Sequence, residues 1–380
     1  MSINKKITFV IPTWERSDQL DECIESIFTA AENSSLNVSI VISDNFSEKE
    51  LTNKQNIIDS FKSESGPKII YKQQETFLAW NDNLLSALEM AIKENADYYW
   101  TFGDDDIVLP ESIKAIELLL KKENNFSGLI HPSSYRQSIH SQKSQKTSLW
   151  NAVNSYGFNE ILGHMSSNIF SHKILEKIIT LKEWNNVYYK SSFTHAHALL
   201  HVAVDTEIIL LHSPMIDNQK NTNQKEIQER WAFEKISSGY YEIPSAVKYQ
   251  IHNNILPKKV SNMFFRYLNF NLWDRLIKQE TIKMLQSENS FNNENWSKIQ
   301  LIADCLEDLN TRKLILVSLV NIQSQVYKSS NISNYLQEML NFHNSSAFPL
   351  EVWHSDPQEF EIMNHGIICS KDNRIYQDGR

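Results

Sequence analysis

Three consecutive carboxylates, Asp104, Asp105 and Asp106, are the side chains whose type and spacing most clearly indicate chemistry. Adjacent carboxylates repel one another, so a folded protein keeps them together only where their charge is compensated. A divalent cation provides this compensation, and hard oxygen ligands favour Mg²⁺ or Mn²⁺ over zinc. The alternative is that the three acids only interact with the dipole of a helix that begins near Pro110. Their position directly after an expected strand favours the metal site.

Two more polar clusters follow apolar runs that are expected to form strands. They are Pro12, Thr13, Glu15 and Arg16 in the first cluster, and Asp44 and Asn45 in the second. The carboxylate of Asp44 can accept hydrogen bonds from a nucleobase or a ribose, or it can form the Asx turn that Asp-Asn sequences readily make. The first cluster can belong to the same site, or it can simply begin the next helix with surface charges.

Alternating strand and helix patterns must position these clusters. We expect strands at residues 7–11, 38–42, 68–71, 97–102 and 128–131, and helices over about 17–31, after residue 45, over 80–94 and from Pro110 onward. This alternation predicts an α/β fold, a mainly parallel sheet flanked by helices. Ligands bind outside the carboxyl ends of the strands in such sheets. The three clusters are therefore expected at one edge of the sheet.

A second domain is expected where the strand signals end. We predict one domain over residues 1–245 and a mainly α-helical C-terminal domain over residues 246–380. Within the second, aromatic residues alternate with Lys and Arg over residues 258–285. This pattern fits a helix at a membrane surface, and equally a core helix with cations on long apolar stems.

The composition narrows the function further. A net charge of −9 over 380 residues argues against a general nucleic-acid binder. The three cysteines form no CxxC pair, which fits a reducing compartment and no thiolate zinc site. No glycine falls into GxGxxG or GxxxxGK spacing, so a bound diphosphate would need a carboxylate-held metal. We find no apolar run long enough for a signal peptide or a membrane span and expect a cytoplasmic protein.

The sequence from residue 7 to about 131 resembles the family 2 glycosyltransferases of GT-A fold. In that family a P-T-x-E/D-R turn and an Asp after the second strand bracket the nucleotide, an A-R-N segment opens a helix, and a D-x-D motif holds the metal. The corresponding residues here are Pro12-Thr13-Trp14-Glu15-Arg16, Asp44-Asn45, Ala79-Trp80-Asn81 and Asp104-Asp105-Asp106. Trp80 stands where the family has Arg, and Gly103 stands where the first Asp is common. Which aspartates bind the metal directly is therefore open.

The resemblance extends to about residue 215 and implies an acceptor side. Residues 163–170 are similar to a family segment that faces the acceptor, which implies this place for His164 and Ser166. His212, after an apolar run, is a candidate contact to the metal or the diphosphate.

The catalytic base of the family is an acidic residue that opens a later helix. By position His195 replaces it, and a histidine can accept a proton from a hydroxyl. The histidines at positions 195, 197 and 201 can equally be ordinary helix residues, and the spacing of His197 and His201 also fits a zinc pair.

The resemblance implies an inverting glycosyltransferase that uses Mn²⁺ or Mg²⁺ and moves a sugar from a nucleotide-sugar donor to a hydroxyl of a glycan or lipid-linked acceptor. The expected setting is the synthesis of a bacterial capsule, lipopolysaccharide or other surface glycan. Peripheral contact with the inner membrane and assembly into a homo-oligomer stay open. The alternatives are a sugar nucleotidyltransferase, although PTWERSDQ lacks the glycine and lysine of its N-terminal loop, and a non-catalytic module that binds nucleotide or carbohydrate.

Overall fold

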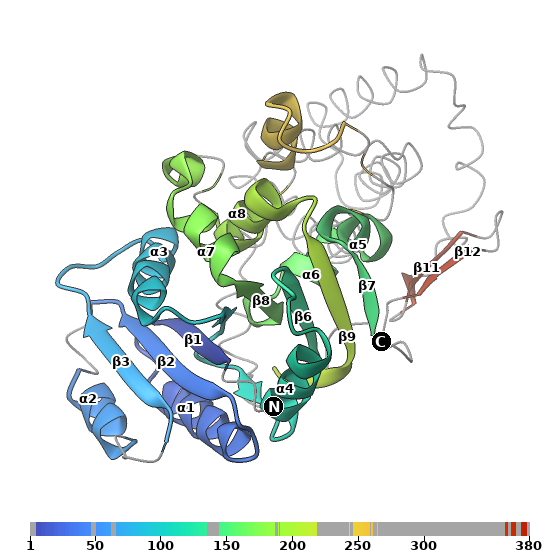
Figure 1. Ribbon diagram of the computed structural model, residues 1–380. Helices are drawn as coiled ribbons and strands as arrows, with labels where there is room; N and C mark the ends of the chain where they lie inside the picture. The colour runs from blue at the N-terminus through green and yellow to red at the C-terminus, as the bar shows by residue number, and fades with distance from the viewer. Residues whose placement is uncertain are drawn as a thin grey trace. The chain divides into compact units, whose positions relative to one another are not determined.

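The structure is a computed structural model of the chain (Figure 1). It describes residues 5–46, 51–61, 66–134, 144–186, 189, 191–218, 243, 246–258, 260, 264, 362–363, 366–369 and 374–377. The chain divides into two compact units, residues 1–230 with 249–259, and residues 231–248 with 260–380. The boundary at residue 245 stays a prediction, and the helices expected beyond residue 265 lie outside the described residues.

The second unit contributes one described sheet. Its strands are β10 (Ile362–Met363), β11 (Gly366–Cys369) and β12 (Arg374–Gln377), and both pairings are antiparallel. None of the helices in the described ranges combines the length and apolar character that a membrane crossing requires.

The first unit begins with the predicted alternation of strands and helices. Its elements are β1 (Lys6–Thr13), α1 (Ser17–Glu32), β2 (Asn37–Asp44), α2 (Leu51–Ser60), β3 (Lys68–Gln73), α3 (Trp80–Ala91), η1 (Ile92–Glu94) and β4 (Tyr98–Thr101). The strands pair in the order β3-β2-β1-β4, and all three pairings are parallel. The carboxyl ends of β1, β2 and β4 therefore lie at one edge, as the sequence predicted.

The remaining elements of this unit widen the sheet. They are β5 (Ile107–Val108), α4 (Ser112–Lys122), β6 (Leu129–Ser134), β7 (Gln145–Ser148), α5 (Leu149–Tyr156), α6 (Phe158–Leu162), η2 (Met165–Ser167), β8 (Asn168–Ser171), α7 (His172–Ile179), η3 (Lys182–Asn185), α8 (Thr194–Ala203) and β9 (Glu207–Asp217). The full strand order is β3-β2-β1-β4-β8-β6-β9-β5, with β7 also on β9. The predicted α/β fold class is confirmed, with a sheet that becomes mixed beyond β4.

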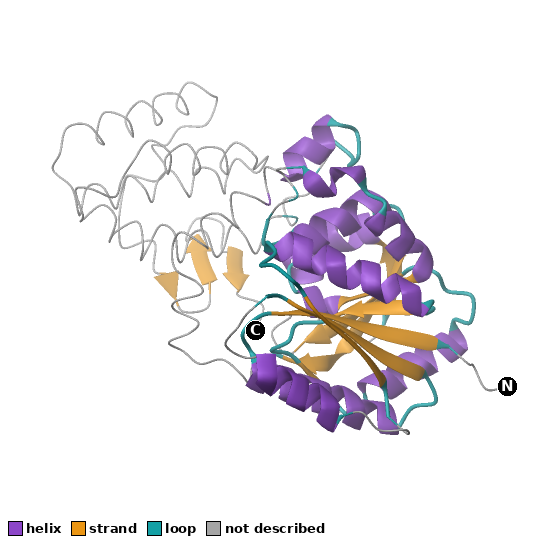
Figure 2. Ribbon diagram, turned by 90° about the vertical axis from the view of Figure 1, so that its left-hand side faces the viewer, coloured by secondary structure: helices purple, strands orange, loops and turns teal. Residues whose placement is uncertain are grey.

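Helices cover both faces of this sheet (Figure 2). Helix α1 contacts α2 and α4 on one face, whereas α3 contacts α7, and α7 contacts α8, on the other. Helix α1 forms where it does because Leu20, Ile24 and Ile27 recur at helical spacing and all three are buried against the sheet. The apolar faces of the helices thus pack against the middle of the strands, and the polar residues lie at the strand ends.

Strand β8 was not predicted, and it matters for the site. It runs antiparallel to β4, with Asn168 opposite Thr101. The amino end of β8 therefore lies beside the carboxyl end of β4, so that η2 and the residues before it reach the turn that contains the three aspartates. Four residues without a clear apolar alternation gave no strand signal in the sequence.

A buried carboxylate fixes α4 against the turn between α1 and β2. Glu117 accepts hydrogen bonds from Ser34 Oγ (3.0 Å), from the Ser35 amide (2.9 Å) and from Ser35 Oγ (2.8 Å). Lys121 and Lys114 complete the network. The hydrogen bond from Lys121 holds the pKa of Glu117 well below its usual range, with the Ser35 and Lys114 contacts acting in the same direction and burial opposing them.

We expect Glu117→Gln to lower the free energy of unfolding by about 2–4 kcal/mol, because it leaves buried donors without a charged acceptor. Urea unfolding measures this change. Since the folded pKa is depressed, the stabilisation is present above the unfolded pKa of about 4.3 and is lost as the pH falls below it toward the folded value. Glu123→Gln, at a part-exposed ion pair with Lys146, is the matched control, with a loss below about 1 kcal/mol. Equal losses in the two variants would contradict this role.

Candidate active site

The turn after β4 contacts the turn after β1. The hydroxyl of Thr13 donates to Asp104 Oδ2 at 2.7 Å. Arg16 Nη1 lies 2.5 Å from Asp104 Oδ1 and 3.3 Å from Asp105 Oδ2. Because β1 and β4 are adjacent and parallel, these residues, about 90 positions apart in sequence, meet at one edge. The structure thus brings together two of the three predicted clusters.

The three aspartates have different surroundings. Asp104 and Asp106 are buried, whereas the side chain of Asp105 is 37% exposed. Burial raises the pKa of Asp104, and the Arg16 charge and the Thr13 hydrogen bond oppose that shift. Asp105 is therefore the carboxylate of the three that is most accessible to a ligand, and Asp104 is held within the protein.

Asp106 is held from the side of β8. Ser166 Oγ accepts a hydrogen bond from the Gly103 amide at 2.8 Å and donates to Asp106 Oδ2. His164 Nε2 lies 3.0 Å from the same carboxylate oxygen, and His164 Nδ1 lies 3.1 Å from Ser167 Oγ. Ser166 is fully buried and holds the aspartate turn, and its predicted place on the acceptor side stays a prediction. His164 is partly exposed beside this turn, and its predicted contact with an acceptor stays a prediction.

Gly103 leaves room for the carboxylates. A Cβ at this position would lie 2.9 Å from Asp106 Oδ2 and 3.1 Å from Asp105 Oδ1. Both neighbours are ends of side chains, so an added methyl group would displace the carboxylates without moving the backbone.

For the metal site that the sequence predicts at this turn, we expect Gly103→Ala to weaken metal binding about 10–100-fold, the usual effect of disturbing groups around a metal. Its melting temperature should fall by less than that of Asp106→Asn, because the displaced carboxylate keeps its charge and its neighbours Ser166 and His164. Gly128→Ala is the contrast, since its Cβ would lie 2.1 Å from the Glu207 carbonyl oxygen, remote from the aspartates. That variant should lose stability and keep its metal dependence. The metal affinity of both variants is measured by titrating Mn²⁺ and following donor binding. An unchanged metal affinity in Gly103→Ala would contradict the expectation.

The cluster of Asp44 and Asn45 is joined to the end of β1 through Asn45. The backbone N–H of Asn45 donates to the Thr13 carbonyl at 2.9 Å. The side-chain Nδ2 of Asn45 donates to the Leu78 carbonyl, and its Oδ1 accepts a hydrogen bond from the Leu78 N–H. Asp44, predicted to contact the nucleotide, is 2% exposed. Lys54 Nζ lies 2.6 Å from its Oδ1, and the Tyr71 hydroxyl donates to its Oδ2 at 2.7 Å. Asp44 therefore lies at the predicted edge with both oxygens engaged by the protein.

Two asparagines begin helix α3. Asn81, the predicted nucleotide contact, is buried and donates to Asp82. Asn83, which the sequence did not single out, accepts a hydrogen bond from Ser43 Oγ at 2.7 Å and donates to the Thr13 carbonyl. Asn83 thus joins the ends of β1 and β2. Its only sequence signal was a second amide in the first turn of a helix at this edge.

Exposed aromatic side chains surround the same edge. In the described part of the chain, four of the five exposed large hydrophobic residues are Trp14, Phe46, Phe77 and Trp80, which we call the aromatic rim. The Trp14 and Phe77 rings meet edge to face at 5.4 Å. Such a cluster of exposed rings indicates a binding surface. Trp80 belongs to it at the position where the resemblance expects Arg.

Two further residues of the first turn have special positions. Pro12 is a buried residue of β1, opposite Ser43 of β2. Glu15 has a φ of 49°, a left-handed conformation that non-glycine residues seldom adopt and that often marks a functional turn. His212 is buried in β9. Burial lowers the pKa of His131 to about 4, and the nearby His164 and His212 act in the same direction.

His195 lies in the first turn of α8, as predicted, but it is only 6% exposed. Its Nε2 lies 2.8 Å from the Leu162 carbonyl oxygen, and its Nδ1 has no partner among the described residues. Burial lowers the pKa of His195 to about 4. A neutral imidazole that donates through Nε2 has its lone pair on Nδ1.

The other two histidines of α8 have separate surroundings. His197 packs against the rings of Phe158 and Tyr189, and burial lowers its pKa to about 3. His201 Nδ1 lies 2.6 Å from the Tyr189 hydroxyl. Both imidazoles thus contact Tyr189, His197 through its ring face and His201 through a hydrogen bond, and the described residues place no third His, Cys, Asp or Glu with them around a metal position.

The described residues contain no preformed group of three or more His, Cys, Asp and Glu side chains around a metal position. The donor set nevertheless fits Mg²⁺ or Mn²⁺, because Asp105 and Asp106 offer carboxylate oxygens at one turn. These ions commonly take one or two protein carboxylates and complete their shell with phosphate and water oxygens.

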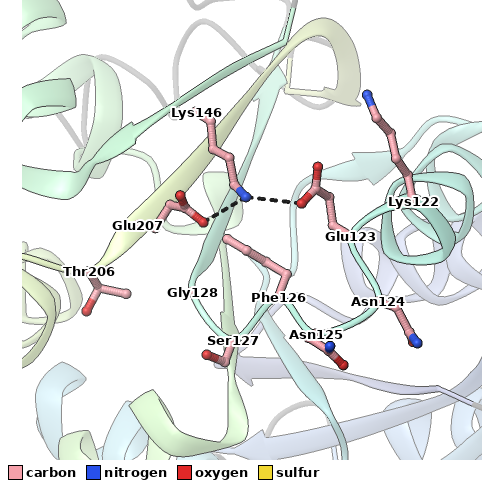
Figure 3. Close-up of a pocket in the computed structure, with 10 residues that line it drawn as sticks. All are labelled: Lys122, Glu123, Asn124, Asn125, Phe126, Ser127, Gly128, Lys146, Thr206 and Glu207. Carbon is pink, nitrogen blue, oxygen red and sulfur yellow. Dashed lines mark hydrogen bonds and ion pairs between the residues drawn. The ribbon is translucent and has the colours of Figure 1, made fainter.

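A separate cavity of about 500 Å³ is lined by Lys122, Glu123, Asn124, Asn125, Phe126, Ser127, Gly128, Lys146, Thr206 and Glu207 (Figure 3). Lys146 bridges Glu123 and Glu207 there, 5.5 Å from the centre of the Phe126 ring. Residues 128 and 207 precede or begin β6 and β9, so this cavity lies at the amino ends of parallel strands. It contains none of the predicted site residues.

Comparisons with known proteins agree with this geometry. Residues 8–189 match the model of glycosyl transferase family 2. The abequosyltransferase RfbV of Salmonella typhimurium is 24% identical over 277 residues, which cover 67% of this chain and 80% of that protein.

Solved structures show the same fold. The crystal structure of residues 1–349 of TarS from S. aureus has a TM-score of 0.53 at 13% identity, covering 98% of this chain and 99% of that one. The same protein in complex with UDP-GlcNAc has a TM-score of 0.50 at 14% identity, with 98% of both chains covered. The family match, the sequence relative and the GT-A architecture agree with the aspartate turn at the strand edge, and residues 8–189 of the chain form a glycosyl transferase family 2 domain.

Proposed function

We propose that the enzyme is an inverting, metal-dependent glycosyltransferase that moves a sugar from a nucleotide-sugar donor to a hydroxyl group of a glycan or lipid-linked acceptor. The observation that carries this proposal is the contact of Thr13 and Arg16 with the aspartate turn. The Arg16 guanidinium, the Thr13 hydroxyl and the accessible Asp105 carboxylate thus lie together at the strand edge where a diphosphate would bind.

Asp105 and Asp106 would hold Mn²⁺ or Mg²⁺, with Asp104 fixing the turn. When bound, the metal would neutralise charge on the departing nucleoside diphosphate. Arg16 is partly exposed and pairs with two of the aspartates, so its guanidinium can also contact phosphate oxygens. Ser166 and His164 hold Asp106 in position.

The nucleoside would lie along the ends of β1 and β2. We assign this part to Pro12, Thr13, Glu15, Arg16, Asn45 and Asn81, with Asp44 beneath. Rings of the aromatic rim offer flat surfaces on which a base can stack, a contact worth about 1–3 kcal/mol. Asn45 joins the loops that carry Trp14, Phe46 and Phe77.

His195 is the proposed base. Its Nε2–H is directed to the Leu162 carbonyl, so Nδ1 carries the lone pair that would take the proton of the acceptor hydroxyl. That hydroxyl would attack C1 of the donor sugar from the face opposite to the diphosphate, which inverts the configuration. Burial lowers the pKa of His195 to about 4, so the imidazole is neutral near pH 7 and its lone pair is available to a proton.

The relatives support a role in the synthesis of bacterial surface glycans such as capsule or lipopolysaccharide. One is named an abequosyltransferase, and the other has been crystallised with UDP-GlcNAc. We place the enzyme in the cytoplasm or at the inner face of the membrane. Residues 246–380 would form a mainly helical domain that contacts the acceptor, the membrane surface or a second copy of the chain.

A donor panel tests the proposal. Thermal shifts are measured with UDP-, GDP-, CMP- and dTDP-sugars, with and without Mn²⁺. One nucleotide should stabilise the protein in the presence of metal, by about 2.7 kcal/mol at a 100-fold excess over Kd. Turnover with a matched acceptor should then release the nucleoside diphosphate. Absence of a metal-dependent shift with every donor would overturn the proposal.

A further inference from the structure

Asp44 is enclosed in a buried ion pair at the end of β2. Lys54 and Asp44 are 1% and 2% exposed, and Lys54 Nζ lies 2.6 Å from Asp44 Oδ1. The Tyr71 hydroxyl donates a hydrogen bond to Asp44 Oδ2 at 2.7 Å. Burial and this hydrogen bond raise the pKa of Tyr71 far above its usual value, so the phenol stays protonated and donates. Each carboxylate oxygen therefore already accepts a hydrogen bond from the protein.

Asp44 lies within reach of a nucleoside diphosphate bound at the aspartate turn. Asp44 ends β2 opposite Thr13 of β1, and Thr13 holds Asp104 after β4. Since neighbouring strands are about 4.8 Å apart, the ends of β2 and β4 are separated by about 10 Å. A nucleoside diphosphate that begins at the aspartate turn reaches this distance, so its base would approach the end of β2.

We infer that Lys54 and Tyr71 determine which bases the donor site accepts, because they remove the Asp44 carboxylate from direct recognition; this inference rests on the proposed function. An accessible carboxylate at this point would select bases that present an N–H group, such as uracil at N3 or guanine at N1, and would repel the lone pair of cytosine N3. An enclosed carboxylate, neutralised by a lysine, imposes no such selection. Cytosine is then accepted as readily as uracil.

The alternative is that a bound base displaces Lys54 or Tyr71 and uses Asp44 directly. That rearrangement would expose a buried ammonium or break its ion pair, both of which are costly in a protein interior. We therefore expect no direct hydrogen bond between Asp44 and the base. Asp44 influences the base only by holding Lys54 and Tyr71 in place.

The experiment measures the binding of UDP, CDP, GDP and dTDP with Mn²⁺ by calorimetry, in the wild type and in Lys54→Met and Tyr71→Phe. The wild type should bind CDP no more than tenfold less tightly than UDP. Each substitution frees one oxygen of Asp44, so the ratio of UDP affinity to CDP affinity should rise about tenfold, the effect of one hydrogen bond to a charged acceptor. A change of general stability would not alter this ratio.

Tyr71→Phe retains the ion pair and carries the test if Lys54→Met does not fold. Matched controls are Lys68→Met, at an exposed ion pair with Glu94, and Tyr156→Phe, at an exposed hydrogen bond with Gln145; neither should change the ratio. Wild-type preference for UDP over CDP by more than tenfold, or unchanged ratios in the variants, would overturn the inference and leave the proposed function standing. Failure of all four nucleotides to bind the wild type would overturn both.

Discussion

Asp105→Asn should reduce turnover by about 10²–10³-fold, the typical effect of removing one group that stabilises developing charge. The substitution keeps the shape of the side chain and removes the charge of the most accessible aspartate of the turn. Because Asp105 is partly exposed, the melting temperature should change little. Steady-state release of nucleoside diphosphate over a range of Mn²⁺ concentrations measures the effect, and the Mn²⁺ concentration for half-maximal activity should rise.

The neighbouring aspartates provide the comparison. Asp104→Asn and Asp106→Asn should lose stability as well as activity, because both carboxylates are buried and hydrogen-bonded. Asp59→Asn, at an exposed contact with Gln55, controls for the loss of a surface charge and should behave as the wild type. Full activity of Asp105→Asn at every Mn²⁺ concentration would remove Asp105 from the metal site.

His195→Gln should lower kcat by about 10²–10⁴-fold, the usual contribution of a general base, with donor affinity unchanged. Glutamine keeps an N–H group for the Leu162 carbonyl and offers no basic nitrogen. Single-turnover transfer and donor binding, measured separately, distinguish loss of the base from loss of the fold. Wild-type kcat in a folded His195→Gln protein would assign the base elsewhere.

His197→Leu is the matched control on the same helix. Its ring is buried and both nitrogens lack a partner among the described residues, so an apolar replacement should retain stability and turnover.

The pH profile is a second check on His195. A pKa lowered to about 4 means that the neutral, proton-accepting form persists below the usual range of histidine. The titration of His195 should therefore produce no inflection in kcat/KM between about pH 5 and pH 8. Because of this residue, kcat/KM should fall only as the pH approaches the lowered pKa. An inflection near pH 6.5 that disappears in His195→Gln would show an accessible, ordinary imidazole.

The sequence by itself determined the strands and helices of the first half of the sheet, β1 to β4 with α1 to α3, and the edge at which their polar residues gather. Apolar runs such as residues 7–11 and 38–42 predicted strands, and the acids and hydroxyls that follow them predicted one shared edge. This succeeds because strand and helix periodicities are local, and because parallel strands bring their carboxyl ends together whatever the details of packing. The contact of Thr13 with Asp104 is the direct result.

Only the tertiary structure decided what each side chain at that edge can do. The antiparallel course of β8 brought Ser166 under the aspartate turn, and the packing of α2 and β3 brought Lys54 and Tyr71 onto Asp44. Exposure separated Asp105 from its neighbours, and the Leu162 carbonyl fixed the nitrogen of His195 that carries the lone pair. Burial and hydrogen-bond partners come from elements far apart in sequence, so no local pattern of residues encodes them.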